Sequence, residues 1–154
     1  MATGFQYKHR LSGAAPTVRS FVVKTGVTAL AIGDLVHIEG SAAARVADLA
    51  ATNDTAFAGA IVGPDYKADG ITPVDLANIA TGERVLVVTD DDAVYAVTDA
   101  NARDGGDTLD IAGTTGAMGV TTSSNVDVVV VADSASTQDT LVALSQANHY
   151  IAGK

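Results

Sequence analysis

Few side chains could bind a metal ion or transfer protons, and the three histidines are the main candidates. His9, His37 and His149 are far apart, and no pair has the H-x-x-x-H or H-E-x-x-H spacing that places two ligands on one face of a helix. His37 lies between Val36 and Ile38, so in a strand it points to the opposite face, and we expect it to be exposed to solvent. The histidines therefore predict no metal site.

Two segments rich in aspartate or glycine could bind a hard cation through carboxylate oxygens. The run Asp90-Asp91-Asp92 lacks the glycine and the downstream glutamate of an EF-hand loop. Asp also favours turns, because its side chain bonds to nearby backbone. Residues 105–110 resemble one copy of a calcium-binding nonapeptide repeat, but such sites are built from stacked copies. We predict turns at both places, and no metal or other cofactor.

Sequence motifs for catalysis are missing as well. There is no cysteine, which excludes disulfides and thiolate metal sites. There is also no G-x-S-x-G elbow, no Walker loop and no G-x-G-x-x-G turn. We therefore expect a protein that is not an enzyme, that has no catalytic residues, and that acts by packing against other protein surfaces.

The formal net charge of −9 restricts the partners. Nucleic acids and anionic membranes attract basic surfaces, so neither is expected as a partner. The apolar runs are much shorter than the roughly 20 residues of a membrane span. The first residues lack the apolar segment of a signal peptide, so we expect the protein to be made and used without export.

Basic and acidic residues are distributed unevenly along the chain. Residues 1–33 contain four of the nine Lys and Arg residues and no acid, whereas residues 34–154 contain the other five and all 18 acids. This asymmetry is typical of an interaction arm on a domain of opposite charge, although a solvated tail without a partner is the alternative. Because residues 1–16 are polar and end at Pro16, we predict an extended arm there and a single β-rich domain over 17–154.

Short segments of apolar and β-branched residues, bounded by Gly, Pro and Asp, predict strands. They cover residues 17–24, 35–39, 45–49, 57–63, 83–90, 93–97, 108–111 and 126–132. Residues 140–144 fit either a strand or a helical turn, and residues 113–125 are predicted as a loop. The three aspartates at 90–92 predict a hairpin between the strands on either side of them. The fold class is therefore all-β, a small β-sandwich or a partly closed β-barrel.

Several of these segments resemble those of phage capsid decoration (cement) proteins of the small β-barrel or sandwich type. The resemblance covers roughly residues 17–145 and is carried by Gly33-Asp34-Leu35-Val36 and by residues 57–63, 82–87, 105–109 and 126–131. It implies a structural protein on the capsid exterior, made in the host cytoplasm, that stabilises the shell by bridging subunits of the major capsid protein. It also implies a homotrimer without catalytic residues.

Under this resemblance the N-terminal segment would lie across the major capsid protein. Aromatic and Arg side chains dominate interface hot spots, and cations would meet acidic patches. The candidate capsid-binding residues are Phe5, Tyr7, Lys8, Arg10, Arg19 and Lys24. Deletion of residues 1–16 is expected to abolish capsid binding and leave a folded core. The alternatives are another β-rich virion component, such as a head fibre or tail part, or a cellular protein-binding module.

Overall fold

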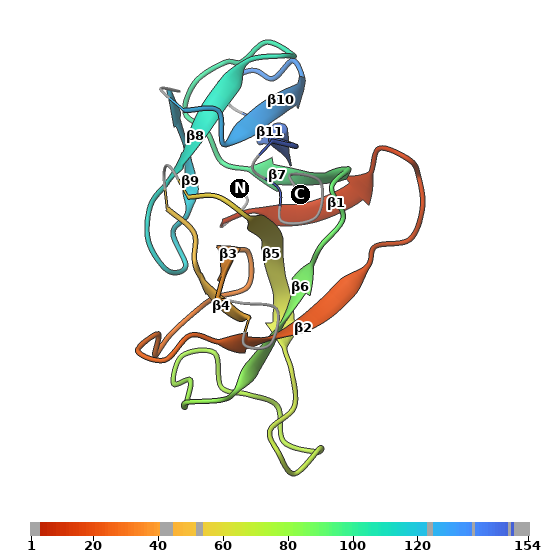
Figure 1. The fold of residues 1–154 in the computed structure, drawn as a ribbon. Helices are drawn as coiled ribbons and strands as arrows, with labels where there is room; N and C mark the ends of the chain where they lie inside the picture. The colour runs from red at the N-terminus through yellow and green to blue at the C-terminus, as the bar shows by residue number, and fades with distance from the viewer. Residues whose placement is uncertain are drawn as a thin grey trace.

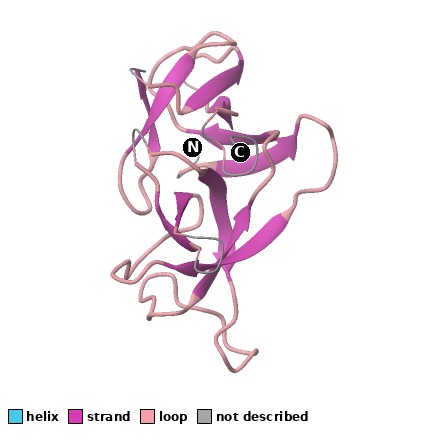
Figure 2. Ribbon diagram, viewed as in Figure 1, coloured by secondary structure: helices cyan, strands magenta, loops and turns pink. Residues whose placement is uncertain are grey.

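A computed structural model describes residues 4–40, 45–51, 54–122, 125–136, 138–147 and 149. Within these ranges the regular elements are all strands (Figure 2). They form two bodies, a closed five-stranded barrel and a six-stranded sheet (Figure 1). The prediction of an all-β fold of the small sandwich or barrel type is confirmed.

The barrel has the strand order β2-β4-β3-β5-β6 and closes because β6 pairs with β2. Its strands are β2 (Val18–Val23), β3 (Leu35–Glu39), β4 (Val46–Leu49), β5 (Phe57–Pro64) and β6 (Arg84–Val88). β2 and β4 are parallel, and the other pairs are antiparallel. Alternate side chains point inward, as the twofold period of a strand requires: Val85 and Val87 are fully buried, whereas Arg84 is exposed.

The sheet has the order β1-β7-β11-β10-β8-β9 and consists of antiparallel pairs. Its strands are β1 (Gln6–Arg10), β7 (Ala93–Val97), β8 (Thr108–Ala112), β9 (Gly119–Thr122), β10 (Val128–Ala132) and β11 (Thr140–Leu144). Every residue of β7 is buried, whereas the edge strand β1 is mostly exposed or half-buried.

One hydrophobic cluster joins the barrel to the sheet. Leu35, Phe57 and Val88 of the barrel belong to the same cluster as Tyr95 and Leu109 of the sheet. A second cluster fills the barrel itself, with Val36, Ile61 and Val87 among its members. The two bodies therefore share buried surface and pack as one unit.

The predicted hairpin at Asp90–Asp92 is wrong. β6 pairs with β2 and β5 in the barrel, whereas β7 pairs with β1 and β11 in the sheet. The aspartates bond instead to the segment between β1 and β2: Asp90 accepts a hydrogen bond from the Thr17 amide at 2.6 Å, and Asp92 accepts one from the Ser12 amide at 3.1 Å. These carboxylates therefore hold the point where the chain passes from barrel to sheet.

The N-terminal segment also differs from the predicted extended arm. Residues 6–10 form β1, which pairs with β7, and Phe5 is buried in the shared core. The cause is the aromatic packing at its start: Phe5 and Tyr7 each make an edge-to-face contact with Tyr95, with ring centroids 6.4 and 6.3 Å apart.

Two further segments, residues 119–122 and 140–144, also form strands. Residues 140–144, which fitted a strand or a helical turn, form β11. Residues 119–122 lie inside the predicted loop but form β9, which pairs with β8. The remaining predicted strands coincide with β2 to β8 and β10 to within a few residues.

Candidate functional site

The six residues proposed to bind a capsid fall into three groups in the structure. Phe5 is only 1% exposed, and its amide donates to the Gly33 carbonyl at 2.7 Å. Tyr7 is half-buried against Tyr95. These two aromatic residues pack within the chain, and the Phe5 side chain is not accessible to a partner in this fold.

Arg10 and Lys24 are bound to acids of the same chain. Arg10 contacts Asp90 at 3.0 Å and Asp92 at 2.6 Å. The Arg10–Asp92 hydrogen bond holds the pKa of the guanidinium above its ordinary value. Lys24 Nζ lies 2.7 Å from Asp48 and 2.8 Å from Glu39, and these two bonds raise the pKa of the ammonium. Both cations therefore have internal partners.

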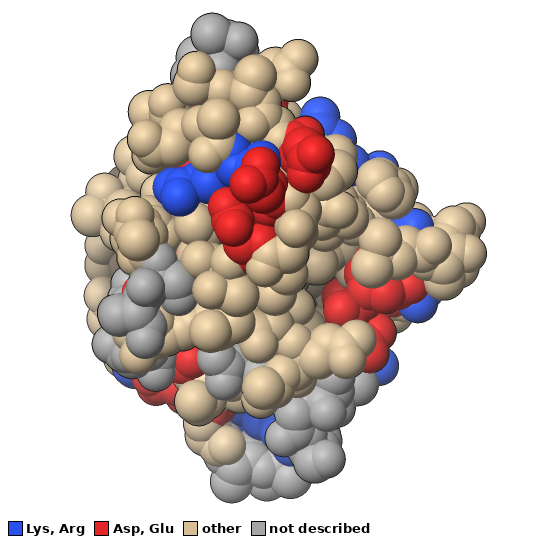
Figure 3. All heavy atoms as spheres, turned by 90° about the horizontal axis from the view of Figure 1, so that it is seen from above, with Lys and Arg blue, Asp and Glu red and all other residues tan. Residues whose placement is uncertain are grey.

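The side chains of Lys8 and Arg19 remain accessible to a partner protein. Both are exposed, and neither forms an ion pair with the residues that the structure describes. On the face drawn in Figure 3, basic and acidic side chains lie next to each other in small groups, with neutral residues between the groups. Lys8 and Arg19 are thus cations of the N-terminal segment that have no ion-pair partner among the described residues, in a chain of net charge −9.

The segment between β1 and β2, residues 11–17, forms a loop that links the sheet to the barrel (Figure 1). All of residues 11–19 are exposed, including the large apolar side chains of Leu11 (60%) and Val18 (43%). Asp92 holds the start of this loop through Arg10 and the Ser12 amide, and Asp90 holds its end through the Thr17 amide. We call residues 11–19 together with Lys8 the N-terminal loop surface.

A second ordered loop, residues 65–83, connects β5 and β6 and projects from the barrel (Figure 1). Ile71 near its tip is 80% exposed. Asp69 holds the tip by accepting hydrogen bonds from the Ile71 and Thr72 amides, both at 2.9 Å, and from the Thr72 hydroxyl at 2.6 Å. The Thr72 hydroxyl bond, with the two amides, lowers the pKa of Asp69 to about 2.

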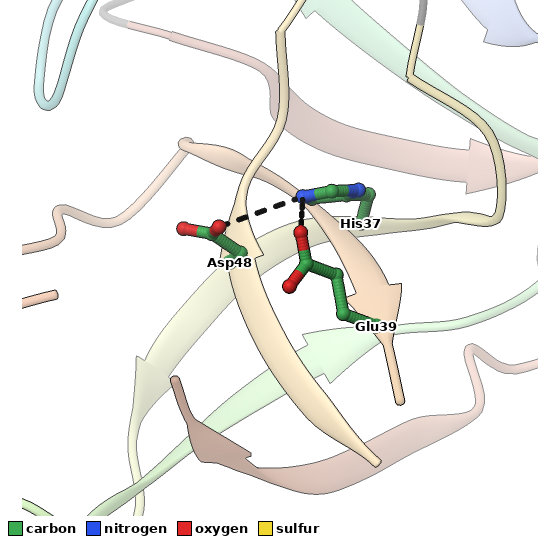
Figure 4. A group of neighbouring side chains, drawn as sticks. All are labelled: His37, Glu39 and Asp48. Carbon is green, nitrogen blue, oxygen red and sulfur yellow. Dashed lines mark ion pairs between the residues drawn. The ribbon is translucent and has the colours of Figure 1, made fainter. Parts of the chain in front are cut away.

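A third feature is a cluster of charged side chains on the barrel, formed by His37 and Glu39 of β3 and Asp48 of β4 (Figure 4). His37 Nε2 lies 3.4 Å from Glu39 Oε1 and 3.7 Å from Asp48 Oδ2. The expectation that His37 is exposed is wrong, since it is only 9% exposed. Sequence motifs could not reveal this cluster, because its third member comes from the neighbouring strand. The sequence did show that His37 and Glu39, two residues apart in one predicted strand, would lie on the same face of that strand.

No protein-family model matches this chain, and no curated protein is significantly similar to it. Within the residues that the structure describes, no helix is long and apolar enough to cross a membrane.

Proposed function

We propose that this chain is a structural virion protein that binds the outer surface of an assembled phage capsid, as a homotrimer, and stabilises it by bridging subunits of the major capsid protein. The all-β barrel and sheet are compatible with the resemblance of the strand segments to capsid decoration proteins. The single observation that carries the proposal is the N-terminal loop surface, an ordered and exposed segment with apolar side chains and with two cations that form no ion pair among the described residues.

The ordering of this loop favours binding. A flexible arm loses conformational entropy when it binds, whereas a loop already held at both ends loses less. Asp92 at one end and Asp90 at the other supply that restraint. Leu11 and Val18 offer apolar surface for burial, and Lys8 and Arg19 offer charge that steers association with an acidic partner.

The contact residues therefore differ from those proposed from sequence. Phe5, Arg10 and Lys24 act within the chain, by packing in the core or by pairing with acids. Lys8 and Arg19 remain candidates, and Leu11 and Val18 join them.

Co-sedimentation tests this proposal. The purified chain is mixed with shells assembled from the major capsid protein encoded in the same genome. We expect binding that saturates at a fixed ratio of chain to capsid protein. The variant Leu11→Asp/Arg19→Glu is expected to lose at least about tenfold in affinity, because it removes an apolar contact and reverses a charge.

The matched control is Ile71→Asp/Lys67→Glu, which makes the same kinds of change on the 65–83 loop and is expected to bind as the unmodified chain does. Loss of binding in the control alone would move the contact to that loop. No binding of the unmodified chain to the shells would refute the function itself. Sedimentation equilibrium of the free chain measures the oligomer, for which a trimer has three times the 15.5-kDa chain mass.

A further inference from the structure

We propose that His37, Glu39 and Asp48 form a binding site for a divalent transition-metal ion, with zinc as the best match. The donor set is one imidazole nitrogen and two carboxylate oxygens. Zinc accepts nitrogen and oxygen ligands together, whereas calcium and magnesium prefer oxygen ligands alone. This inference goes beyond capsid binding and does not depend on it.

The pairing of β3 with β4 places the three ligands on one face. His37 lies directly opposite Asp48 in the antiparallel register, and Glu39 is two residues further along β3, on the same side as His37. All three ligand atoms lie within 4.8 Å of one another. The side chains therefore converge because of strand geometry rather than through the fold of a flexible loop.

The two distances from His37 to the carboxylates are close to those between ligands of a shared metal ion. Zinc bonds to nitrogen and oxygen of 2.0–2.1 Å, at tetrahedral angles, separate two ligand atoms by about 3.3 Å. His37 Nε2 is 3.4 Å from Glu39 Oε1 and 3.7 Å from Asp48 Oδ2. These separations require only small side-chain movements to close around an ion, which leaves a fourth position for water.

The position of His37 among carboxylates is a second observation that fits a bound cation. Its side chain is 11% exposed, points into the cluster (Figure 4), and forms ion-pair contacts with Glu39, Asp48 and Asp54. Its contacts are carboxylate oxygens at 3.4 to 3.7 Å. These separations are longer than an ordinary N–H···O hydrogen bond of 2.7–3.2 Å, and a bound ion would give Nε2 a shorter contact.

Outer contacts orient His37 and Asp48, as is typical of metal sites. His37 Nδ1 faces Asp54 Oδ2 at 3.6 Å, so the second ring nitrogen can donate to a carboxylate while Nε2 binds the ion. The Leu49 amide donates to Asp48 Oδ1 at 2.8 Å, which leaves Oδ2 facing the cluster.

Lys24 is also the competitor for this site. Its ammonium lies 2.7 Å from Asp48 Oδ2, the same oxygen that the ion needs, and 2.8 Å from Glu39 Oε2. The Lys24 side chain is 39% exposed, so it can release Asp48 and extend into solvent while the ion binds. Removal of the ammonium should therefore strengthen metal binding, whereas a metal ion that bound elsewhere would be insensitive to it.

Isothermal titration of the full, untagged chain with zinc chloride tests the proposal. We expect one ion per chain, with affinity reduced at least about tenfold in His37→Ala and Glu39→Gln, and by about tenfold in Asp54→Asn. Lys24→Met should bind more tightly than the unmodified chain. His9→Ala is the control, because His9 is exposed on β1, far from the cluster in sequence, and is expected to leave affinity unchanged.

Thermal unfolding gives a second measurement, because an ion bound only by the folded state raises the melting temperature. The rise should vanish in Glu39→Gln, whose half-exposed side chain makes this variant the least disruptive to folding. Circular dichroism checks that each variant is folded. If neither the unmodified chain nor Lys24→Met binds zinc, or if only His9→Ala loses it, the cluster is an internal ion-pair network and the proposal fails.

Discussion

Gly59 shows how one backbone position limits the packing of the barrel. Its φ of +145° is a conformation that side chains rarely adopt, and an added Cβ would lie 1.9 Å from the Val88 carbonyl oxygen and 2.7 Å from the Tyr95 hydroxyl. The first of these atoms is backbone and cannot move away without displacing β6. The packing of β5 against the end of β6 at this point therefore requires glycine at position 59.

Substitution of Gly59 tests this dependence. We expect Gly59→Ala to lower the free energy of unfolding by about 3 kcal/mol or more, measured by urea denaturation, because strain and overlap add. The control is Gly26→Ala, which has a φ of +97° but no atom within 4 Å of the added Cβ. It should lose only about 1–2 kcal/mol from backbone strain. Equal losses in the two variants would show that close packing at Gly59 does not matter.

Asp92 makes stability depend on pH. Hydrogen bonds from Ser12 and from Arg10 lower the pKa of Asp92 to about 2 in the folded chain. An unfolded Asp has a pKa near 3.9, so the folded state favours the ionised form. The stabilisation is therefore fully present above about pH 5 and is lost as the pH falls through 4 toward 2.

The variant Asp92→Asn measures this contribution. At pH 7 it should be less stable than the unmodified chain by about 1 kcal/mol, a value reduced for partial solvent screening. The difference should shrink as the pH is lowered from 5 to about 2. Asp104→Asn serves as the control, because the Asp104 carboxylate forms no ion pair or hydrogen bond within the described residues. A difference that stays constant with pH would contradict the assignment.

At the scale of elements, local sequence predicted the strands well and their pairing poorly. β5, β6 and β7 consist mostly of apolar residues, many of them β-branched, and such composition is visible without a structure. The assignment of β6 to the barrel and of β7 to the sheet depends on contacts between distant segments, such as Asp90 with Thr17. A run of three aspartates carries no information about those contacts.

The missed strands have a different cause. β1 reads Gln-Tyr-Lys-His-Arg and is an edge strand, so most of its side chains face solvent and no apolar alternation marks it. β9 has only four residues at the opposite edge. The His37 cluster was missed for a related reason, since strand register, and not spacing along the chain, brings Asp48 to His37.

The loop at residues 65–83 supports a prediction about local order. Asp69 Oδ1 accepts from the amides of both Ile71 and Thr72, so it fixes the exposed tip. In Asp69→Ala we expect faster hydrogen–deuterium exchange at these two amides, with the global unfolding transition nearly unchanged because the tip is exposed. Unchanged exchange at Ile71 and Thr72 would mean that other contacts hold the tip. Exchange at the Phe5 amide, bonded to Gly33, is the internal reference.

At the scale of the whole molecule, the barrel and the sheet should unfold together. The cluster that joins them contains residues from both bodies, and Phe5 belongs to it. Its amide bonds to Gly33 ahead of β3, while its ring packs on Tyr95 of β7. The N-terminal segment is therefore part of the connection between the two bodies, and a single cooperative transition is expected by calorimetry.

This connection changes what an N-terminal truncation should do. An extended arm could be removed without loss of fold, but a chain of residues 17–154 lacks β1 and Phe5, which exposes the edge of β7 and leaves a cavity against Tyr95. We expect this truncated chain to lose its cooperative transition or to melt at a much lower temperature. Loss of capsid binding on truncation would then report unfolding as well as lost contact.

Two point variants separate the roles of side chain and strand. Phe5→Ala should lower the free energy of unfolding by about 3–5 kcal/mol, as expected for a buried aromatic residue, whereas Gln6→Ala, at the exposed next position, should change it by no more than about 0.5 kcal/mol. Denaturant unfolding of both measures the difference. If the truncated chain and Phe5→Ala both melt like the unmodified protein, the first sixteen residues are a separable arm after all, and the loop between β1 and β2 loses its structural basis as a preformed binding surface.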